Sequence, residues 1–292
     1  MNRRGFLGLL GGAAAVTALA GCGAARGSTG EELASRVPLP QPYRVPLPVP
    51  PVARPAGVHP SGAELYRITQ RVAEAEILPG VRTPVLGYDG IFPGPTIETR
   101  RGRPVVVRHR NELPVPTVVH LHGGHTPADS DGWPLDLVLP AGDSRDWTGH
   151  HGMTGDLAAG EREHVYPTDQ RAATLWYHDH RMDFTGPAVY RGLLGLHVVR
   201  DDEEDALPLP RGDRELPLLI CDRSFADDGS FAYPASTREC GRSRASRTSG
   251  WRACWATSCS STGRRGRCTR WTPRATGCAC STRRTRGSTS SC

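Results

Sequence analysis

The sequence of 292 residues contains 36 basic and 30 acidic side chains, which gives a formal net charge of +6. Residues 240–292 contribute 12 arginines and no acidic residue, which leaves 24 basic against 30 acidic residues in 1–239. Because this larger part is mildly acidic, it lacks the positive charge that binds phosphate backbones, and we exclude a nucleic-acid partner. Seven of the nine cysteines also lie in 240–292, so the rest is expected to fold without a disulfide framework.

Residues 1–22 are predicted to be an export signal, because a charged start precedes an apolar run that ends in small residues. The run is too short for a comfortable transmembrane helix. The pair Arg3-Arg4 followed by Gly-Phe-Leu resembles a twin-arginine signal, and Leu-Ala-Gly-Cys ending at Cys22 resembles a bacterial lipobox. We therefore expect twin-arginine export to an extracytoplasmic location, with membrane contact only through a lipid anchor on Cys22. An ordinary signal peptide is the alternative.

Residues 23–60 are predicted to be a Pro-rich linker and surface strap. Nine prolines lie between residues 37 and 60. Proline lacks a backbone N–H and fixes φ, so this segment cannot form a helix or a central strand. We expect it to run extended over the surface of the domain that follows.

Residues 61–201 are predicted to form one all-β domain. Short β-rich runs are separated by Gly and Pro turns, and no apolar period of 3.6 residues is sustained. This pattern is typical of a Greek-key β-sandwich or barrel. The predicted strands are Glu64–Ala73, Thr96–Thr99, Pro104–Arg108, Thr117–Leu121, Thr174–His180 and Leu193–Val199.

Residues 202–237 are predicted to be a linker and the start of a second domain. The acidic run at 201–205 is expected to be a solvated domain edge, and Leu216–Ile220 is predicted to be a strand.

The tail at 238–292 is predicted to be disordered. Ordering the 53 residues of 240–292 costs about 80 kcal/mol at roughly 1.5 kcal/mol each. Burying its three Trp side chains returns only about 10 kcal/mol. We hypothesise that the tail is a frameshifted reading of a second domain, with the slip near 236–241. A genuine Arg/Ser/Cys-rich secreted tail is the alternative.

Two histidine pairs carry the strongest chemical signal. His120 and His122 end one β-rich run, and His178 and His180 end another. On a strand, residues i and i+2 project from one face about 6.6 Å apart, while the residue between them points to the other face. Two imidazoles at that spacing can ligate neighbouring metal ions. Two such pairs in one β domain predict a histidine-only site for copper, zinc, iron or nickel.

The motifs around these histidines resemble a known family. His-Leu-His-Gly at 120–123 and Leu-Trp-Tyr-His-Asp-His at 175–180 are similar to the first two copper motifs of multicopper oxidases, in the branch of bacterial laccases, bilirubin oxidases and phenoxazinone synthase. The segments 88–97, 126–132 and 190–195 resemble the same branch. The resemblance covers roughly residues 38–235 and implies a cupredoxin-like domain.

The resemblance implies a role for each matched residue. His120 corresponds to a ligand of the type 2 copper, and His122, His178 and His180 correspond to ligands of the type 3 pair. Asp131 matches an acidic residue that assists proton delivery, and an Asx turn before the following glycine is the competing interpretation. The remaining histidines in polar stretches are interpreted as non-ligands: His125, His150, His151 and His164.

The resemblance also implies a copper-dependent oxidoreductase. Such an enzyme takes single electrons from phenolic, bilirubin-like or metal-ion substrates and reduces O2 to water. No histidine follows His197 and no His-Cys-His occurs, so half of the trinuclear ligands and the whole type 1 site are absent from this sequence. We expect the chain to be inactive alone, with O2 and a small reducing substrate as partners of the full-length protein.

Two other functions are compatible with parts of this pattern. A non-enzymatic copper-binding or cell-envelope protein on the same fold is the alternative, although retention of all four histidines favours the oxidase. A copper nitrite reductase would carry its type 1 cysteine in the first domain, and residues 23–220 contain no cysteine.

Overall fold

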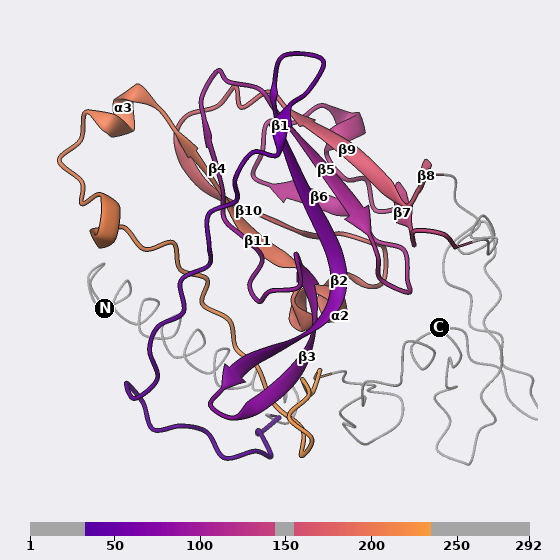
Figure 1. Ribbon diagram of the computed structural model, residues 1–292, viewed down its shortest axis with the longest axis vertical. Coiled ribbons are helices and arrows are strands. Elements are labelled where there is room, and N and C mark those ends of the chain that lie inside the picture. The colour runs from indigo at the N-terminus through magenta and orange to yellow at the C-terminus, as the bar shows by residue number, and fades with distance from the viewer. Residues whose placement is uncertain (1–32, 144–154, 235–292) are drawn as a thin grey trace, which may run out of the picture.

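The computed structural model describes residues 33–143 and 155–234 and shows two curled sheets packed face to face (Figure 1). One sheet has the order β1 (Gly57–Val58), β2 (Glu64–Leu78), β5 (Val105–Asn111) and β9 (Glu161–Tyr166), and β3 (Val81–Tyr88) also pairs with β2. The other has the order β4 (Ile97–Arg100), β11 (Leu194–Arg200), β10 (Ala173–Asp179) and β6 (Val119–His122). A small third sheet pairs β7 (Leu137–Leu139) with β8 (Leu157–Ala159).

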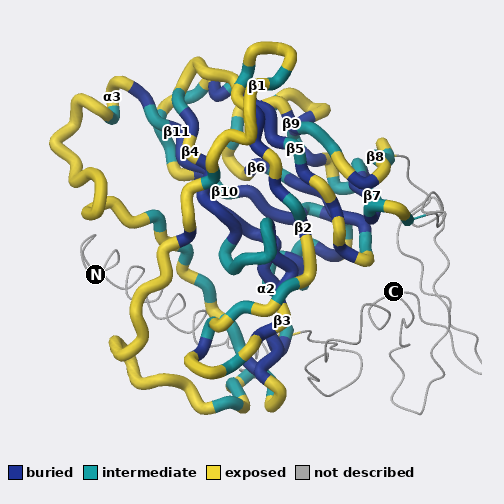
Figure 2. Tube along the Cα trace, viewed as in Figure 1, coloured by how far each residue is buried: buried dark blue, intermediate teal, exposed yellow. Residues whose placement is uncertain are grey.

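The core lies between the two main sheets, where alternate residues of each strand meet (Figure 2). Strand β5 reads Val-Val-Val-Arg-His-Arg-Asn, so β-branched side chains enter the core while the second arginine stays exposed. Tight turns with special backbone geometry separate the strands, as at Gly80 (φ 73°) between β2 and β3. The all-β sandwich expected from the sequence is confirmed, and each of the six strands predicted in 61–201 has a counterpart. The largest buried members of the core include Tyr66, Ile68, Tyr88, Ile97, Tyr166 and Tyr177.

A second, smaller apolar cluster holds both ends of the described chain to the sandwich. Phe225 and Phe231 are buried against Leu78 and Val85 of the β2–β3 hairpin. The backbone N–H of Arg36 donates to the carbonyl of Phe225 at 2.8 Å, so the N-terminal strap lies beside this cluster. Further along the strap, residues 37–51 are irregular and largely exposed, and Val52 forms an isolated bridge with Thr96.

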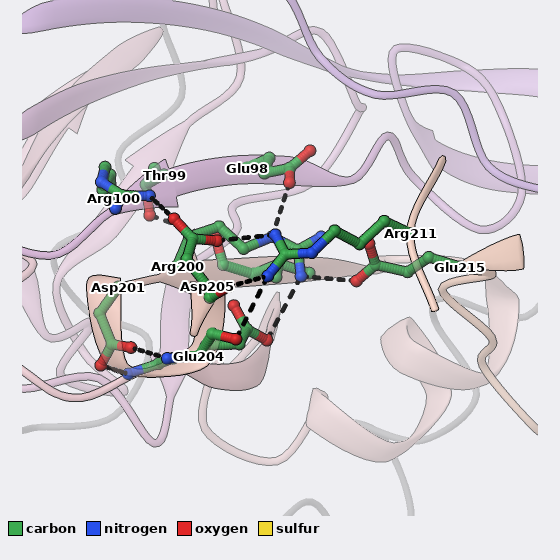
Figure 3. A network of polar contacts seen from close by, with 11 residues as sticks. Glu98, Thr99, Arg100, Arg200, Asp201, Glu204, Asp205, Arg211 and Glu215 are labelled. Carbon is green, nitrogen blue, oxygen red and sulfur yellow. Dashed lines mark hydrogen bonds and ion pairs between the residues drawn. The ribbon is translucent and has the colours of Figure 1, made fainter. Parts of the chain in front are cut away.

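The acidic run at 201–205 is largely solvated, as expected, and only Asp201 is buried. The carboxylate of Asp201 is buried and caps the short helix α3 (Asp202–Asp205) by accepting from the N–H of Glu204 at 2.7 Å. Arg100 pairs with Asp205 at 2.8 Å and also with Asp202. The acidic residues therefore anchor the segment to the end of β4 (Figure 3).

The strand predicted at Leu216–Ile220 is wrong. This segment has no regular structure, and three of its four large apolar side chains are half or fully exposed: Leu216, Leu218 and Ile220. Ion pairs hold the preceding residues instead: Arg200 donates to Glu98 at 2.7 Å and to Glu215 at 2.5 Å (Figure 3). An apolar segment forms a β-strand only where a neighbouring strand completes the hydrogen-bond ladder.

Helices are short throughout the described part. They are α2 (Thr185–Arg191), α3 and the 3₁₀ turns η1 (Ala128–Ser130) and η2 (Gly212–Arg214). No helix in residues 33–143 or 155–234 is long and apolar enough to cross a membrane. The predicted export signal, Cys22, His150, His151 and the tail from residue 235 lie outside the described residues.

Candidate metal centre

The pairing of β6 with β10 brings the two histidine motifs together. The strands are antiparallel, with His120 opposite His178 and His122 opposite Trp176. The N–H of His180 donates to the carbonyl of Val118 at 3.0 Å, which continues the pairing one residue past β10. The four imidazoles therefore share the outer face of this sheet.

The residues between the histidines point the other way, as the strand period requires. Leu121 is 3% exposed and Asp179 is 1% exposed, and both lie on the inner face of the sheet. The carboxylate of Asp179 accepts from the N–H of Val118 at 3.2 Å and of Arg181 at 3.1 Å. Burial raises the pKa of Asp179 to about 6. This side chain ties β6 to the end of β10 beneath the histidines.

The imidazole nitrogens converge on one small volume. One ring nitrogen from each of His120, His122 and His178 lies within 4.8 Å of the others. The ring of His180 lies 4.8 Å from that of His120 and 5.7 Å from that of His178, measured between centroids. The structure thus brings all four predicted ligands together.

Backbone carbonyls orient three of the four rings. The Nδ1 of His120 lies 2.5 Å from the carbonyl of Asp131, and the Nδ1 of His180 lies 3.2 Å from that of Gly132. The Nδ1 of His178 lies 2.7 Å from the carbonyl of Asp179. A carbonyl can only accept, so each Nδ1 carries the proton and each Nε2 presents its lone pair. Histidine ligands commonly donate their other ring N–H to a backbone carbonyl in this way, which fixes the tautomer and the ring orientation.

A tight turn after η1 supplies two of those carbonyls. Gly132 has φ 81°, and a Cβ at this position would lie only 2.2 Å from the carbonyl oxygen of Val119. Glycine therefore lets the turn approach β6 closely and places the carbonyls of Asp131 and Gly132 under the histidine rings.

Asp131 contacts the site through its side chain as well as its backbone. One carboxylate oxygen lies 3.5 Å from Nδ1 of His120, and the side chain is half exposed. The same oxygen accepts from the hydroxyl of Thr126 at 2.8 Å. The carboxylate is thus oriented by a neighbouring side chain, where an Asx turn would use backbone N–H groups.

Burial favours the neutral form of one imidazole of the site, that of His178. Burial, reinforced by the neighbouring histidines, lowers the pKa of His178 to about 4. Its Nε2 therefore holds a lone pair at neutral pH, and binding of a metal ion there displaces no proton.

The donors present fit a metal ion. Nδ1 of His122 and Nε2 of His178 are 3.4 Å apart. Two ligands with bonds of about 2.0–2.1 Å to one tetrahedral ion are separated by about 3.3 Å. An all-imidazole set suits copper, zinc, iron or nickel, so the donor chemistry alone does not select among them.

The histidines interpreted as non-ligands have other surroundings. His125 is exposed, and its ring lies 3.3 Å from the carbonyl of Asp169. His164 is buried in the core, where its Nδ1 lies 3.2 Å from that of His109. The polar residues that flank His164 did not predict its burial, although it lies between the partly exposed Glu163 and the exposed Val165 on β9.

Comparison with known proteins identifies the family. Residues 70–204 match the family model described as multicopper oxidase. The matched segment, residues 70–204, is a domain of the multicopper oxidase family. Over 176 residues the chain is 42% identical to a laccase of Bacillus subtilis (strain 168), a match that covers 53% of this chain and 32% of the laccase. Over 197 residues it is 34% identical to a bilirubin oxidase of Albifimbria verrucaria, covering 65% and 31%.

Solved structures give the same assignment. A multi-copper oxidase from Pediococcus acidilactici superposes with a TM-score of 0.57 at 29% identity, over 71% of this chain and 40% of that one. This likeness confirms the cupredoxin-like fold expected of this multicopper oxidase domain. The chain spans about a third of the length of the curated relatives it matches.

Proposed function

We propose that this chain carries half of the trinuclear copper site of an oxidase, held by His120, His122, His178 and His180. The observation that supports this most strongly is the convergence of three imidazole nitrogens within 4.8 Å on the outer face of β6 and β10. The proposed reaction of the full-length protein is one-electron oxidation of phenolic, bilirubin-like or metal-ion substrates coupled to reduction of O2 to water. Bound copper would supply the stepwise electron transfer that this reaction requires.

The protein's own groups would prepare the site for that chemistry. The carbonyls of Asp131, Gly132 and Asp179 fix three rings with Nε2 toward the shared volume. Preoriented ligands lose little entropy on binding, which favours a metal that must cycle between oxidation states without leaving the site.

Asp131 is proposed to carry protons for O2 reduction. Its carboxylate is half exposed and touches the edge of His120, so it faces both solvent and the site. The hydroxyl of Thr126 holds one carboxylate oxygen, which leaves the other to exchange a proton with water.

Catalytic turnover would require a longer protein than this chain. The sequence has no histidine after His197 and no His-Cys-His, so the other trinuclear ligands and the type 1 copper ligands must come from elsewhere. We propose that this chain alone binds copper and does not turn over. We also propose a frameshift near residues 236–241, because residues 240–292 combine 12 arginines with no acidic residue and too little apolar surface to fold.

We also propose that the protein acts outside the cytoplasm. The twin-arginine pattern at Arg3-Arg4 supports export of a folded protein, and the lipobox pattern supports a lipid anchor on Cys22. Mass spectrometry of the mature N-terminus tests both: a diacylated Cys22 supports the anchor, and an unprocessed Met1 opposes export.

The test of the oxidase proposal is the nucleotide sequence of the gene from codon 225, read in all three frames. Downstream codons for His-x-x-His-x-His and His-Cys-His are expected in a shifted frame. The protein expressed from the corrected frame should consume O2 with a phenolic donor only when copper is bound. A gene with no such codons in any frame would overturn the oxidase assignment for this locus.

A further inference from the structure

The ring of His122 is held differently from the other three imidazoles. His120, His178 and His180 each face a backbone carbonyl through Nδ1. Within the described ranges, the ring of His122 makes no such bond, and its Nδ1 faces only Nε2 of His178, at 3.4 Å. His122 is also exposed, so neither burial nor a backbone partner restricts its rotamer.

Trp176 supplies the missing restraint. Its ring is stacked on that of His122 with centroids 5.3 Å apart and planes 25° apart. It is stacked more closely on His178, at 4.0 Å and 26°. One flat indole thus lies against both imidazoles whose nitrogens face each other.

The sheet makes this arrangement unavoidable for a residue at this position. Trp176 is the cross-strand partner of His122. It also precedes His178 by two residues on β10, so the two side chains share one face. A large planar side chain there reaches both rings, whereas a branched aliphatic one would cover area without fixing ring orientation.

We propose that Trp176 is a positioning residue that sets the planes of His122 and His178 so that Nδ1 of one and Nε2 of the other address the same ion. The inference rests on the proposed function, in which these histidines bind copper. It assigns Trp176 no contact with the metal and no electron-transfer role. The alternative is that Trp176 only covers apolar surface of the sheet and does not orient the imidazoles.

Two substitutions in the full chain separate these alternatives. Trp176→Phe keeps a flat ring, and Trp176→Leu keeps apolar bulk without one. Trp133→Leu is the matched control, because Trp133 is exposed and lies near the site in the turn that holds Gly132. Thermal unfolding of each apo protein checks the fold, and Trp176→Met replaces Trp176→Leu if the latter does not fold.

Each protein is titrated with Cu²⁺ against a competing chelator, and pulsed EPR counts the imidazole nitrogens coupled to the copper. We expect Trp176→Leu to bind copper about tenfold more weakly and to lose one coupled imidazole. Trp176→Phe should stay within about threefold of the wild type, and Trp133→Leu should be unchanged. A loss of stability alone would not change the count of coupled nitrogens in the folded fraction.

The possible failures are distinguishable. If the wild type binds Cu²⁺ and Trp176→Leu shows the same affinity and the same count of coupled nitrogens, this inference is overturned while the proposed function stands. Equal weakening in the Phe and Leu variants would also overturn it, because bulk and not ring orientation would then matter. A wild-type chain that binds no Cu²⁺ would overturn the proposed function and this inference with it.

Discussion

Three histidines buried in the sandwich core should make the domain acid-sensitive. His109 and His164 lie 3.2 Å apart between their Nδ1 atoms, and His197 faces the hydroxyl of Thr99 at 2.9 Å. Burial lowers the pKa of His164 and of His197 to about 4, and lowers that of His109 well below its usual range. None of these three is one of the proposed metal ligands.

The sign of the effect follows from proton uptake. A histidine with a usual pKa near 6.5 is protonated in the unfolded chain below that pH, while a buried one with a pKa of about 4 stays neutral. The unfolded state therefore binds more protons between pH 6.5 and 4, and the free energy of unfolding falls as the pH falls through that window. From pH 7.5 to 5, one such histidine lowers this free energy by about 2 kcal/mol.

His197→Phe isolates this contribution. The substitution keeps an aromatic ring beside Tyr166, and the Thr99 hydroxyl retains the carbonyl of Val198 at 3.3 Å. Asp179, whose pKa is raised to about 6, opposes the trend by gaining its proton more readily in the folded state. That opposing contribution is the same in both proteins and cancels in the comparison.

The assay is urea unfolding of the metal-free chain at pH 7.5 and 5. We expect the wild type to lose about 2 kcal/mol more than His197→Phe between the two pH values. His125→Gln, which alters an exposed histidine, should lose as much as the wild type. Equal losses in the wild type and in His197→Phe would refute the assignment of His197 as a neutral core histidine.

Three further substitutions test the packing, two beside the histidine site and one in the second apolar cluster. Gly132→Ala should weaken Cu²⁺ binding more than tenfold in a chelator competition, because its Cβ would lie 2.2 Å from the carbonyl oxygen of Val119 and displace the turn; unchanged affinity would mean that the turn does not orient the histidines. Tyr177→Phe removes a buried hydrogen bond of 2.6 Å to the carbonyl of Pro95 and should cost about 1 kcal/mol in urea unfolding. Copper affinity should be preserved in Tyr177→Phe, and a large loss would show that the inner face of β10 controls the outer one. Phe231→Ala should lower the free energy of unfolding by about 3–5 kcal/mol because this ring is 2% exposed. A loss under 1 kcal/mol would contradict the packing of Phe231 against the β2–β3 hairpin.

The sequence predicted the strands that carry the histidines because their period of two is local. His120 and His122 lie on one face of β6, with Leu121 buried between them, as alternation requires. What could not be predicted is which histidine faces which, since that depends on the register of β6 against β10. The stacking of Trp176 on His122 depends on the same register, so the sequence alone could not predict it.

The carbonyl partners of the rings were hidden for a similar reason. The sequence predicts a role for the carboxylate of Asp131, whereas the backbone carbonyl of Asp131 also contacts His120. Side-chain identity does not report where a backbone carbonyl points, and only the glycine after Asp131 hinted at a close turn. The wrong strand at Leu216–Ile220 shows the converse limit, because a strand pattern says nothing about whether a partner strand exists.

The most direct test of the central claim is Cu²⁺ binding by the full chain, measured by equilibrium dialysis with EPR on the bound fraction. We predict that the wild type binds Cu²⁺ through several imidazole nitrogens and that the double variant His120→Gln, His178→Gln binds at least a hundredfold more weakly. The matched control His59→Gln, His125→Gln also removes two histidines, but neither belongs to the cluster, and it should bind as the wild type does. Equal binding by both double variants would contradict the assignment of the β6–β10 histidines as the copper site.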